Sequence, residues 1–340
     1  MTTQPTAARA GSLLSWLAGA ALGAAAAAAA GAGVTIEKTA FRGWPNCYRV
    51  SNGVVEFVAT TDVGPRIISY AFVGGTNVFF VREDFAGQTG GAEWKNYGGH
   101  RIWHAPEDKV RTYEPDNSAI QAKVVENGLL LTMPPGPVSG IQKEIEITLA
   151  PSSTEVRVVH RLRNAGAWPV ELAPWAISVM APGGFAIAPM PTAFHPDRLL
   201  PNRALTLWPY TDMRDDRWLW GTDYVLLRQK VVQGQERTKV GINSNHGWAA
   251  YYLKPDLFIK RFSYVEGARY PDFHSSLEVF SNNRMLELET LGPLVTLQPS
   301  AVTAYEERWE LHRNIDLAFS EDDVRAKVEP LARGGAGARR

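Results

Sequence analysis

Residues 144–149 read EIEITL, and residues 156–162 read VRVVHRL. Apolar and polar side chains alternate in both stretches, and a period of two places them on opposite faces of a β-strand. Asn52-Gly53 and Asn127-Gly128 each separate two such stretches. This dipeptide supplies the positive φ angles of a tight hairpin. The pattern therefore predicts antiparallel strands joined by short turns.

The same alternation continues through the body of the chain, from about residue 34 to residue 315. Further strands are predicted at 48–50, 54–58, 122–125, 129–133, 171–180, 224–230, 248–253, 257–264, 276–281, 285–290, 294–298 and 302–311. Helical periodicity is nearly absent, and no internal repeat or low-complexity linker divides the body. Many short strands at this spacing predict one all-β domain, a large antiparallel sandwich or barrel.

The N-terminal segment, residues 1–33, has the layout of a secretory signal peptide. Arg9 precedes an apolar run that starts at Leu13 and ends in small residues near Ala32. We expect cleavage between Ala28 and Val34, export to the periplasm or beyond, and no stable membrane insertion afterwards. The alternative is an uncleaved anchor, because the run is marginally long enough to span a bilayer.

The C-terminal segment, residues 316–340, predicts a short helix followed by a disordered tail. Ser320 precedes the acidic run 321–323, and a polar cap followed by acidic residues is typical of a helix start. The helix is expected to end near Ala332. Glycine, alanine and arginine make up most of the remaining tail from Gly334.

The composition excludes several classes of protein. Lysine plus arginine and aspartate plus glutamate number 35 each, so the net charge is zero and nothing attracts nucleic acid. The single cysteine, Cys47, permits no internal disulfide and no cysteine-based zinc site. No phosphate-binding loop, dinucleotide motif or Gly-x-Ser-x-Gly elbow is present, and we expect no cofactor.

Residues 97–107 form the densest polar cluster, with two histidines, an arginine, a tryptophan and a glutamate. If they form a strand, His100, Ile102 and His104 share one face. Three interpretations stay open here. The histidines could bind a metal, the cluster could hold loops together as a buried polar group, or it could contact a substrate through residues such as Trp103 and Glu107.

Residues 285–293, MLELETLGP, would place Glu287 and Glu289 on one face of a strand, about 7 Å apart. A carboxylate in reach of a sugar hydroxyl can act as a general base, and this separation also fits an inverting glycosidase. Alternating leucine and glutamate is, however, also typical of a solvated outer face, and the pattern alone favours that interpretation.

Arg66 follows Gly64-Pro65 and enters an apolar strand. Its guanidinium would either pair with a carboxylate or reach a polar cleft, where its forked donors suit sugar hydroxyls. The eleven tryptophans are mostly expected in the core. A minority in a cleft would stack on the apolar face of a pyranose ring.

Taken in order, the stretches 63–69, 97–107, 172–176 and 286–293 resemble an uncharacterised bacterial family of the galactose mutarotase-like (aldose 1-epimerase-like) superfamily. The resemblance covers roughly residues 35–312. It implies a large twisted antiparallel β-sandwich, called the supersandwich, and carbohydrate as the partner.

The resemblance also implies roles for individual residues. Aldose 1-epimerases use a glutamate in a Leu-Glu-Thr strand as the base, and Glu289 lies in Leu288-Glu289-Thr290. Arg66 and His100 follow the order of the arginine and histidine that lie near the sugar. Asp223 matches an aspartate of these enzymes.

The sequence departs from the epimerases at the catalytic acid. Those enzymes carry an Asn-His pair after a short strand, whereas this chain reaches Pro174-Trp175. A tryptophan cannot protonate a ring oxygen. Either His104 or His195 takes this role, or the protein does not interconvert anomers.

Three functional hypotheses follow. The first is an isomerase in which Glu289 is the base, His100 or His104 is the acid, and Arg66 steadies the developing charge. The second is a secreted sugar-binding protein without chemistry, in which Trp103 and Trp175 stack on the sugar. The third is a glycoside hydrolase or lyase. The candidate substrate-binding residues are Trp103, Glu107, Trp175, Asp223 and Glu287.

Overall fold

The computed structural model describes residues 33–191, 197 and 199–334. The predicted signal peptide, except Gly33, lies outside the described residues, as do His195 and the tail beyond Gly334. Export, signal cleavage and the domain boundaries stay predictions. In the described part of the chain, no helix has both the length and the apolar character needed to cross a membrane.

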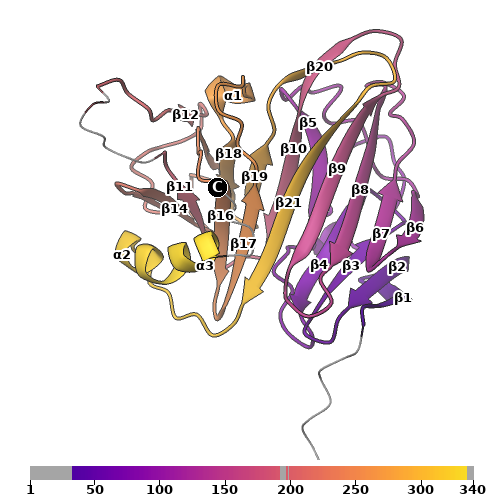
Figure 1. Cartoon of the computed structure of the whole chain (residues 1–340), viewed down its shortest axis with the longest axis horizontal. Helices are drawn as coiled ribbons and strands as arrows, with labels where there is room; N and C mark the ends of the chain where they lie inside the picture. The colour runs from indigo at the N-terminus through magenta and orange to yellow at the C-terminus, as the bar shows by residue number, and fades with distance from the viewer. Residues whose placement is uncertain (1–32, 192–196, 198, 335–340) are drawn as a thin grey trace, which may run out of the picture. The chain divides into compact units, whose positions relative to one another are not determined.

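The strands of residues 33–334 form two sheets in which all pairings are antiparallel (Figure 1). The first sheet has the order β1 (Thr35–Phe41), β2 (Trp44–Ser51), β3 (Val55–Thr60), β4 (Arg66–Phe72), β5 (His100–Ala105), β10 (Val170–Met180), β19 (Leu286–Leu291), β18 (Leu277–Ser281), β15 (Thr238–Ile242) and β12 (Leu205–Leu207), and β20 (Val295–Leu297) pairs with β10. The second has the order β13 (Trp218–Trp220), β14 (Tyr224–Arg228), β11 (Phe185–Pro189), β16 (Trp248–Leu253), β17 (Asp256–Phe262), β21 (Val302–His312), β9 (Val156–Asn164), β8 (Ile141–Leu149), β7 (Gly128–Thr132) and β6 (Gln121–Val125). The predicted all-β antiparallel sandwich is confirmed.

Both predicted hairpins are present. Asn52 and Gly53 connect β2 to β3, and Gly53 takes a φ of 83°. The side-chain oxygen of Asn52 accepts hydrogen bonds from the backbone N–H groups of Val54 and Val55. In the second hairpin, between β6 and β7, Asn127 takes a φ of 55°. The left-handed backbone that closes each turn therefore comes from one residue of the dipeptide.

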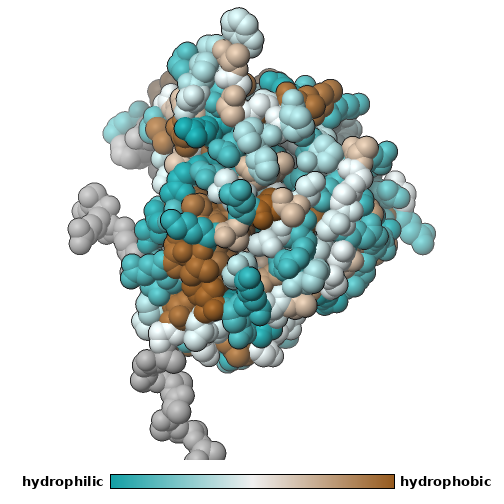
Figure 2. All heavy atoms as spheres, turned by 90° about the vertical axis from the view of Figure 1, so that its right-hand side faces the viewer, coloured by the Kyte–Doolittle hydropathy of each residue, from teal (hydrophilic) through white to brown (hydrophobic). Residues whose placement is uncertain are grey.

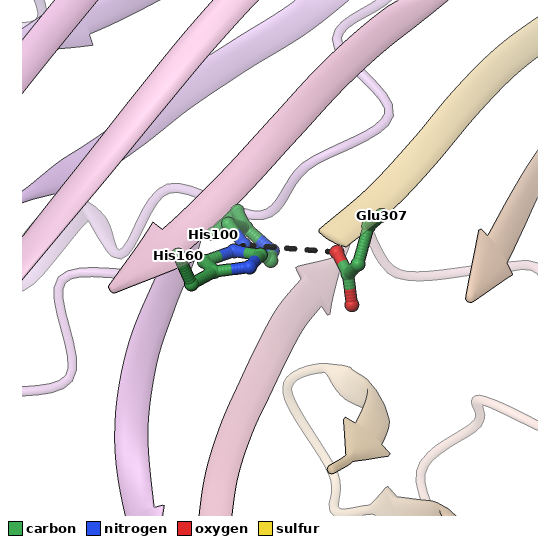
Figure 3. A group of neighbouring side chains, drawn as sticks. All are labelled: His100, His160 and Glu307. Carbon is green, nitrogen blue, oxygen red and sulfur yellow. Dashed lines mark hydrogen bonds and ion pairs between the residues drawn. The ribbon is translucent and has the colours of Figure 1, made fainter. Parts of the chain in front are cut away.

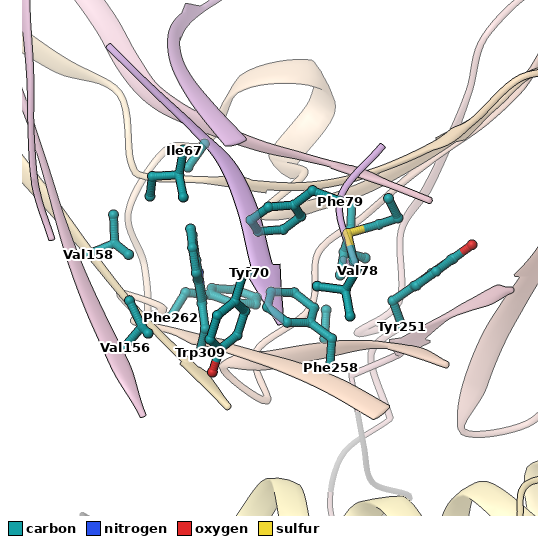
Figure 4. Packing of buried hydrophobic residues seen from close by; sticks show 14 of the residues in the cluster. Ile67, Tyr70, Val78, Phe79, Val156, Val158, Tyr251, Phe258, Phe262 and Trp309 are labelled. Carbon is teal, nitrogen blue, oxygen red and sulfur yellow. The ribbon is translucent and has the colours of Figure 1, made fainter. Parts of the chain in front are cut away.

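The main core fills the space between the two sheets. Tyr70, Phe79, Phe258 and Trp309 interlock there largely edge to face (Figure 4), with the rings of Phe79 and Trp309 5.5 Å apart. Such aromatic pairs add about 0.5–1.5 kcal/mol each beyond the area they bury. The hydrophobic face of β19 joins this core through Leu286 and Leu288.

The C-terminal segment is helical, as predicted. It comprises α2 (Glu321–Asp323), a π-helical turn (Val324–Val328) and α3 (Glu329–Gly334), and the Ser320 hydroxyl accepts a hydrogen bond from Asp323 N–H as the N-cap. Its apolar side chains pack on the outer face of the second sheet. Two further short elements are a 3₁₀ turn (Glu83–Phe85) and α1 (Pro271–His274). On the face in Figure 2, hydrophilic side chains cover most of the surface and surround a few apolar areas, the most extended of which is compact.

Candidate functional site

A pocket of about 370 Å³ lies on the outer face of the first sheet, at its centre. Five neighbouring strands, β5, β10, β19, β18 and β15, each supply side chains to it. Loops on either side complete its walls. Its lining residues are Trp94, Asn96, Arg101, Trp103, Glu107, Tyr113, Trp175, Trp208, Tyr210, Arg237, Lys239, Phe280, Asn282, Met285 and Glu287.

Strand β19 supplies two acidic side chains to this side of the sheet. Its leucines enter the core, so Glu287 and Glu289 both point to the opposite face, as the period of two predicts. Their exposed fractions are 9% and 1%. The interpretation of this face as solvated is therefore wrong, because aromatic side chains and loops cover it.

Glu289 lies beneath the pocket and is held by two donors. Its Oε2 accepts hydrogen bonds from Trp175 Nε1 at 2.8 Å and from Lys239 Nζ at 3.0 Å. Lys239 also forms an ion pair of 2.7 Å with Glu278. The Lys239 ammonium thus forms ion pairs with two buried carboxylates, Glu278 and Glu289.

The pKa values in this group are coupled. Burial raises the pKa of Glu289 and raises that of Glu278 well above its usual range, although the Lys239 ammonium pulls both downward. Burial alone would lower the pKa of Lys239, but the two carboxylates outweigh it and raise that pKa well above its usual range. Lys239 therefore stays protonated, and burial favours the protonated form of the two carboxyl groups, Glu278 and Glu289.

Glu287 is the glutamate of β19 that lines the pocket itself. Its Oε1 accepts hydrogen bonds from Arg101 Nη2 at 3.1 Å and from Asn96 Nδ2 at 3.3 Å. Glu107, also in the lining, accepts a 2.5 Å hydrogen bond from the Tyr113 hydroxyl. The pocket therefore contains two carboxylates that belong to different parts of the chain.

Aromatic rings form much of the pocket wall. The Trp103 ring lies edge to face with Trp94, Tyr113 and Trp175, at centroid distances of 4.9, 5.0 and 5.4 Å. The Lys239 ammonium lies 4.5 Å from the Trp208 ring centroid and 4.9 Å from that of Trp175. A sugar ring is apolar on one face and polar at its rim, so it can pack on an indole face that lies beside charged groups.

His100 and His104 share a face with Ile102, as predicted, but that face points into the space between the sheets. Neither histidine belongs to the pocket lining. The alternating residues of β5, Arg101 and Trp103, point into the pocket instead. The structure therefore does not bring His100 or His104 together with Glu289 around one cavity.

His104 is buried, and this burial lowers its pKa to about 3. The unfolded chain takes up a proton near pH 6.5, whereas the folded protein does so only near pH 3. The unfolded state thus binds more protons between these values, and stability falls as the pH drops through this window. We expect wild-type protein to lose about 1.4 kcal/mol more per pH unit than His104→Gln between pH 5.5 and 4.5. Urea unfolding at both pH values measures this, and equal slopes would show that His104 is charged in the folded protein.

His100 belongs to a buried cluster that bridges the two sheets (Figure 3). Its Nδ1 lies 2.9 Å from Ser178 Oγ, and its Nε2 lies 2.7 Å from His160 Nε2. His160 Nδ1 lies 3.0 Å from the Tyr305 carbonyl oxygen, so it carries the proton and donates. His100 Nε2–H then donates to His160, and the Ser178 hydroxyl donates to His100 Nδ1. Burial lowers the pKa of both histidines, which fits this neutral chain.

Glu307 completes the cluster and is the third residue with a potential metal ligand. The ligand atoms of His100, His160 and Glu307 lie within 4.8 Å of one another. Glu307 is already paired with Lys260 Nζ at 2.9 Å and accepts hydrogen bonds from Thr290 and Trp309. An ion would have to displace the His100–His160 hydrogen bond and share Glu307 with an ammonium, and the hydrogen bonds account for the cluster without one.

Arg66 and Asp223 both lie outside the pocket lining. Arg66 is buried, with its Nη2 2.7 Å from Asp116 Oδ2 and its Nη1 donating to the Gly98 carbonyl oxygen. Of the two roles expected for Arg66, pairing with a carboxylate or reaching a polar cleft, the structure has the first, a structural ion pair. Asp223 instead pairs with Arg325 of the C-terminal helical segment at 2.7 Å.

Comparisons with known proteins bear on the fold. No protein-family model and no curated protein sequence matches this chain. A proposed aldose 1-epimerase from Klebsiella pneumoniae superposes with a TM-score of 0.56 at 13% identity, covering 90% of this chain and 88% of its own. A galactose mutarotase-like protein from Lactobacillus casei gives 0.50 at 9% identity, covering 78% and 100%.

The chain has the galactose mutarotase-like fold. The same sandwich occurs in larger proteins, since a TPR-domain containing protein from Parabacteroides distasonis matches at 13% identity and a TM-score of 0.52. That match covers 80% of this chain and 48% of the other. At such identities the likeness establishes the fold, and the reaction has to be argued from the pocket.

Proposed function

We propose that the pocket on the first sheet binds a carbohydrate. The observation that carries this proposal is the combination of indole rings with paired charged groups in one cavity, at Trp103, Trp175, Glu287 and Lys239. A pyranose ring presents C–H groups on one face, which pack on an aromatic ring, and hydroxyls around its edge, which require both donors and acceptors. The galactose mutarotase-like fold supports the same assignment.

Replacement of Trp208 tests the proposal, because this ring lies at the pocket beside Lys239. We expect Trp208→Ala to weaken sugar binding about 10-fold or more, since removing an aromatic ring that stacks on a nucleobase, a comparable ring contact, costs about 1–3 kcal/mol. Saturation-transfer NMR and calorimetry with a panel of monosaccharides and their methyl glycosides measure it. Trp168→Ala is the matched control, since Trp168 is 80% exposed and does not line the pocket. Equal loss in both variants, or no binding by the wild type, would contradict the proposal.

A second candidate function is acid–base interconversion of aldose anomers. It is favoured by the two carboxylates, Glu107 and Glu287, which line one cavity beside the cation Lys239. Glu287 is the more accessible base, whereas Glu289 of the sequence-based hypothesis lies beneath Trp175. A positioned acid or base contributes about 10²–10⁴-fold to such a proton transfer.

NMR of freshly dissolved α-glucose and α-galactose distinguishes binding from catalysis. Acceleration of anomeric equilibration that is lost in Glu287→Gln would make Glu287 the base, and loss in Glu289→Gln alone would favour Glu289. Sugar binding without acceleration above the buffer rate would leave the protein as a non-catalytic sugar-binding protein.

A further inference from the structure

Several buried hydrogen-bond donors at the pocket have no acceptor among the described residues. Arg101 is 2% exposed, and its Nε and Nη1 have no hydrogen-bond partner among the described residues. The indole N–H groups of Trp94 and Trp103 are likewise buried without a partner. Buried donors without partners are few in folded proteins, and each one costs about 1–3 kcal/mol. A cluster of them around one cavity indicates that a ligand or water supplies acceptors there.

Arg237 adds an accessible cation to the same pocket. It is exposed at the pocket, and in the described part of the chain no hydrogen bond or ion pair joins its guanidinium to another side chain. Arg237 directly precedes β15, and Lys239, two residues further along on that strand, lines the same pocket. Lys239 neutralises Glu289 and Glu278, whereas Arg237 forms no ion pair with an acidic side chain within residues 33–191, 197 and 199–334.

In each carboxylate at the pocket, one oxygen accepts hydrogen bonds from the described residues, and the other stays available to a ring hydroxyl. Oε1 of Glu287 already accepts from two donors, Oε2 of Glu289 accepts from two, and Oε1 of Glu107 accepts from Tyr113. A neutral sugar hydroxyl both donates and accepts, so it needs acceptors as well as donors. A carboxylate only accepts, and its planar geometry matches the paired N–H groups of a guanidinium.

We propose that the preferred ligand is an acidic sugar, a uronic acid or its glycoside, whose carboxylate is held by Arg237 beside Lys239. This inference rests on the proposed carbohydrate-binding function and names its ligand class. The ring stacks on the indole wall, and the carboxylate occupies the donor-rich side of the pocket. Glu107 and Glu287 remain for ring hydroxyls, which supply the donors that a carboxylate lacks.

The test compares the methyl glycosides of galacturonic and glucuronic acid with those of galactose and glucose, by calorimetry on the full chain. We expect at least one uronate to bind about 10- to 100-fold more tightly than its neutral counterpart, the range expected for hydrogen bonds to a charged group. Arg237→Gln should weaken binding of the uronate more than that of its neutral counterpart, so that the preference disappears. Arg228→Gln, an exposed arginine on β14 outside the pocket, should keep it.

The outcomes separate the two proposals. Equal or tighter binding of the neutral sugars overturns the acidic-sugar inference and leaves carbohydrate binding in place. A uronate preference that survives in Arg237→Gln also overturns the inference, because the carboxylate is then held elsewhere. If none of the four glycosides binds, the proposed function fails for these sugars, and the inference fails with it.

Discussion

Lys260→Met is expected to destabilise the protein by about 3–5 kcal/mol, the usual cost of removing one partner of a buried ion pair. Lys260 and Glu307 are both fully buried, with Nζ 2.9 Å from Oε1. The ammonium also donates to the carbonyl oxygens of Ala176 and Leu288. Its loss leaves a buried carboxylate without a counter-ion and removes the donor from both carbonyls. Urea unfolding at pH 7 measures the change.

A surface ion pair provides the matched control. Lys230 lies 2.5 Å from Asp216, and the two side chains are 39% and 74% exposed, so solvent reaches both charges. Lys230→Met should therefore change the free energy of unfolding little, because water stabilises each charge alone. In the double variant Lys260→Met/Glu307→Gln the uncompensated charge is gone, and part of the stability should return. If Lys260→Met destabilised no more than Lys230→Met, the interior pair would be in contact with water.

Lys239→Met is expected to have the largest effect on ligand binding, together with a loss of stability of about 3–5 kcal/mol. Its ammonium separates the carboxylates of Glu278 and Glu289, and without it these two buried groups repel each other. It also lies beside the rings of Trp175 and Trp208, so its removal changes the pocket wall. Sugar affinity should fall about 10- to 100-fold, because a charged hydrogen-bond donor is lost.

A second substitution separates the two effects of Lys239. In Lys239→Met/Glu289→Gln one carboxylate becomes a neutral amide, which can still accept the hydrogen bond from Trp175. Stability should largely recover, whereas sugar affinity should stay low. Calorimetric titration and thermal unfolding of both variants measure this. Recovery of affinity together with stability would mean that Lys239 acts only on folding.

The sequence predicts the strands well where one face is apolar and the other polar. Residues 144–149 and 156–162 belong to β8 and β9, whose outer faces are partly exposed, so their alternation is plain. Strand β11, Phe185–Pro189, was missed because all five of its side chains are buried and nothing alternates. Strand β15 was missed for the same reason, and Lys239 was missed with it.

The candidate site was predicted only in part, and the reason is physical. Alternation identified which residues of β5 and β19 share a face, but it does not tell which face points inward when both are buried. His100, His104 and Trp103 were therefore all candidates, although the two histidines lie on the opposite side of the sheet from Trp103, and Arg101 was missed. The partner of Arg66 is 50 residues away in Asp116, and no local pattern identifies such a contact.

The central strands of the first sheet carry charged or hydrogen-bonding groups on both faces, and this has a consequence for alignment during folding. In an ordinary strand a shift by one residue exposes leucine and buries glutamate, which the hydrophobic effect penalises. In β19 such a shift would exchange Glu289 with Thr290, which would separate Lys239 from the Glu289 carboxylate and remove the hydrogen bond from Thr290 to Glu307. The ion pair of Glu289 with Lys239 on one side of the strand and the hydrogen bond of Thr290 to Glu307 on the other thus define the register of β19. Unpaired buried charge, rather than exposed hydrocarbon, disfavours the misaligned pairing.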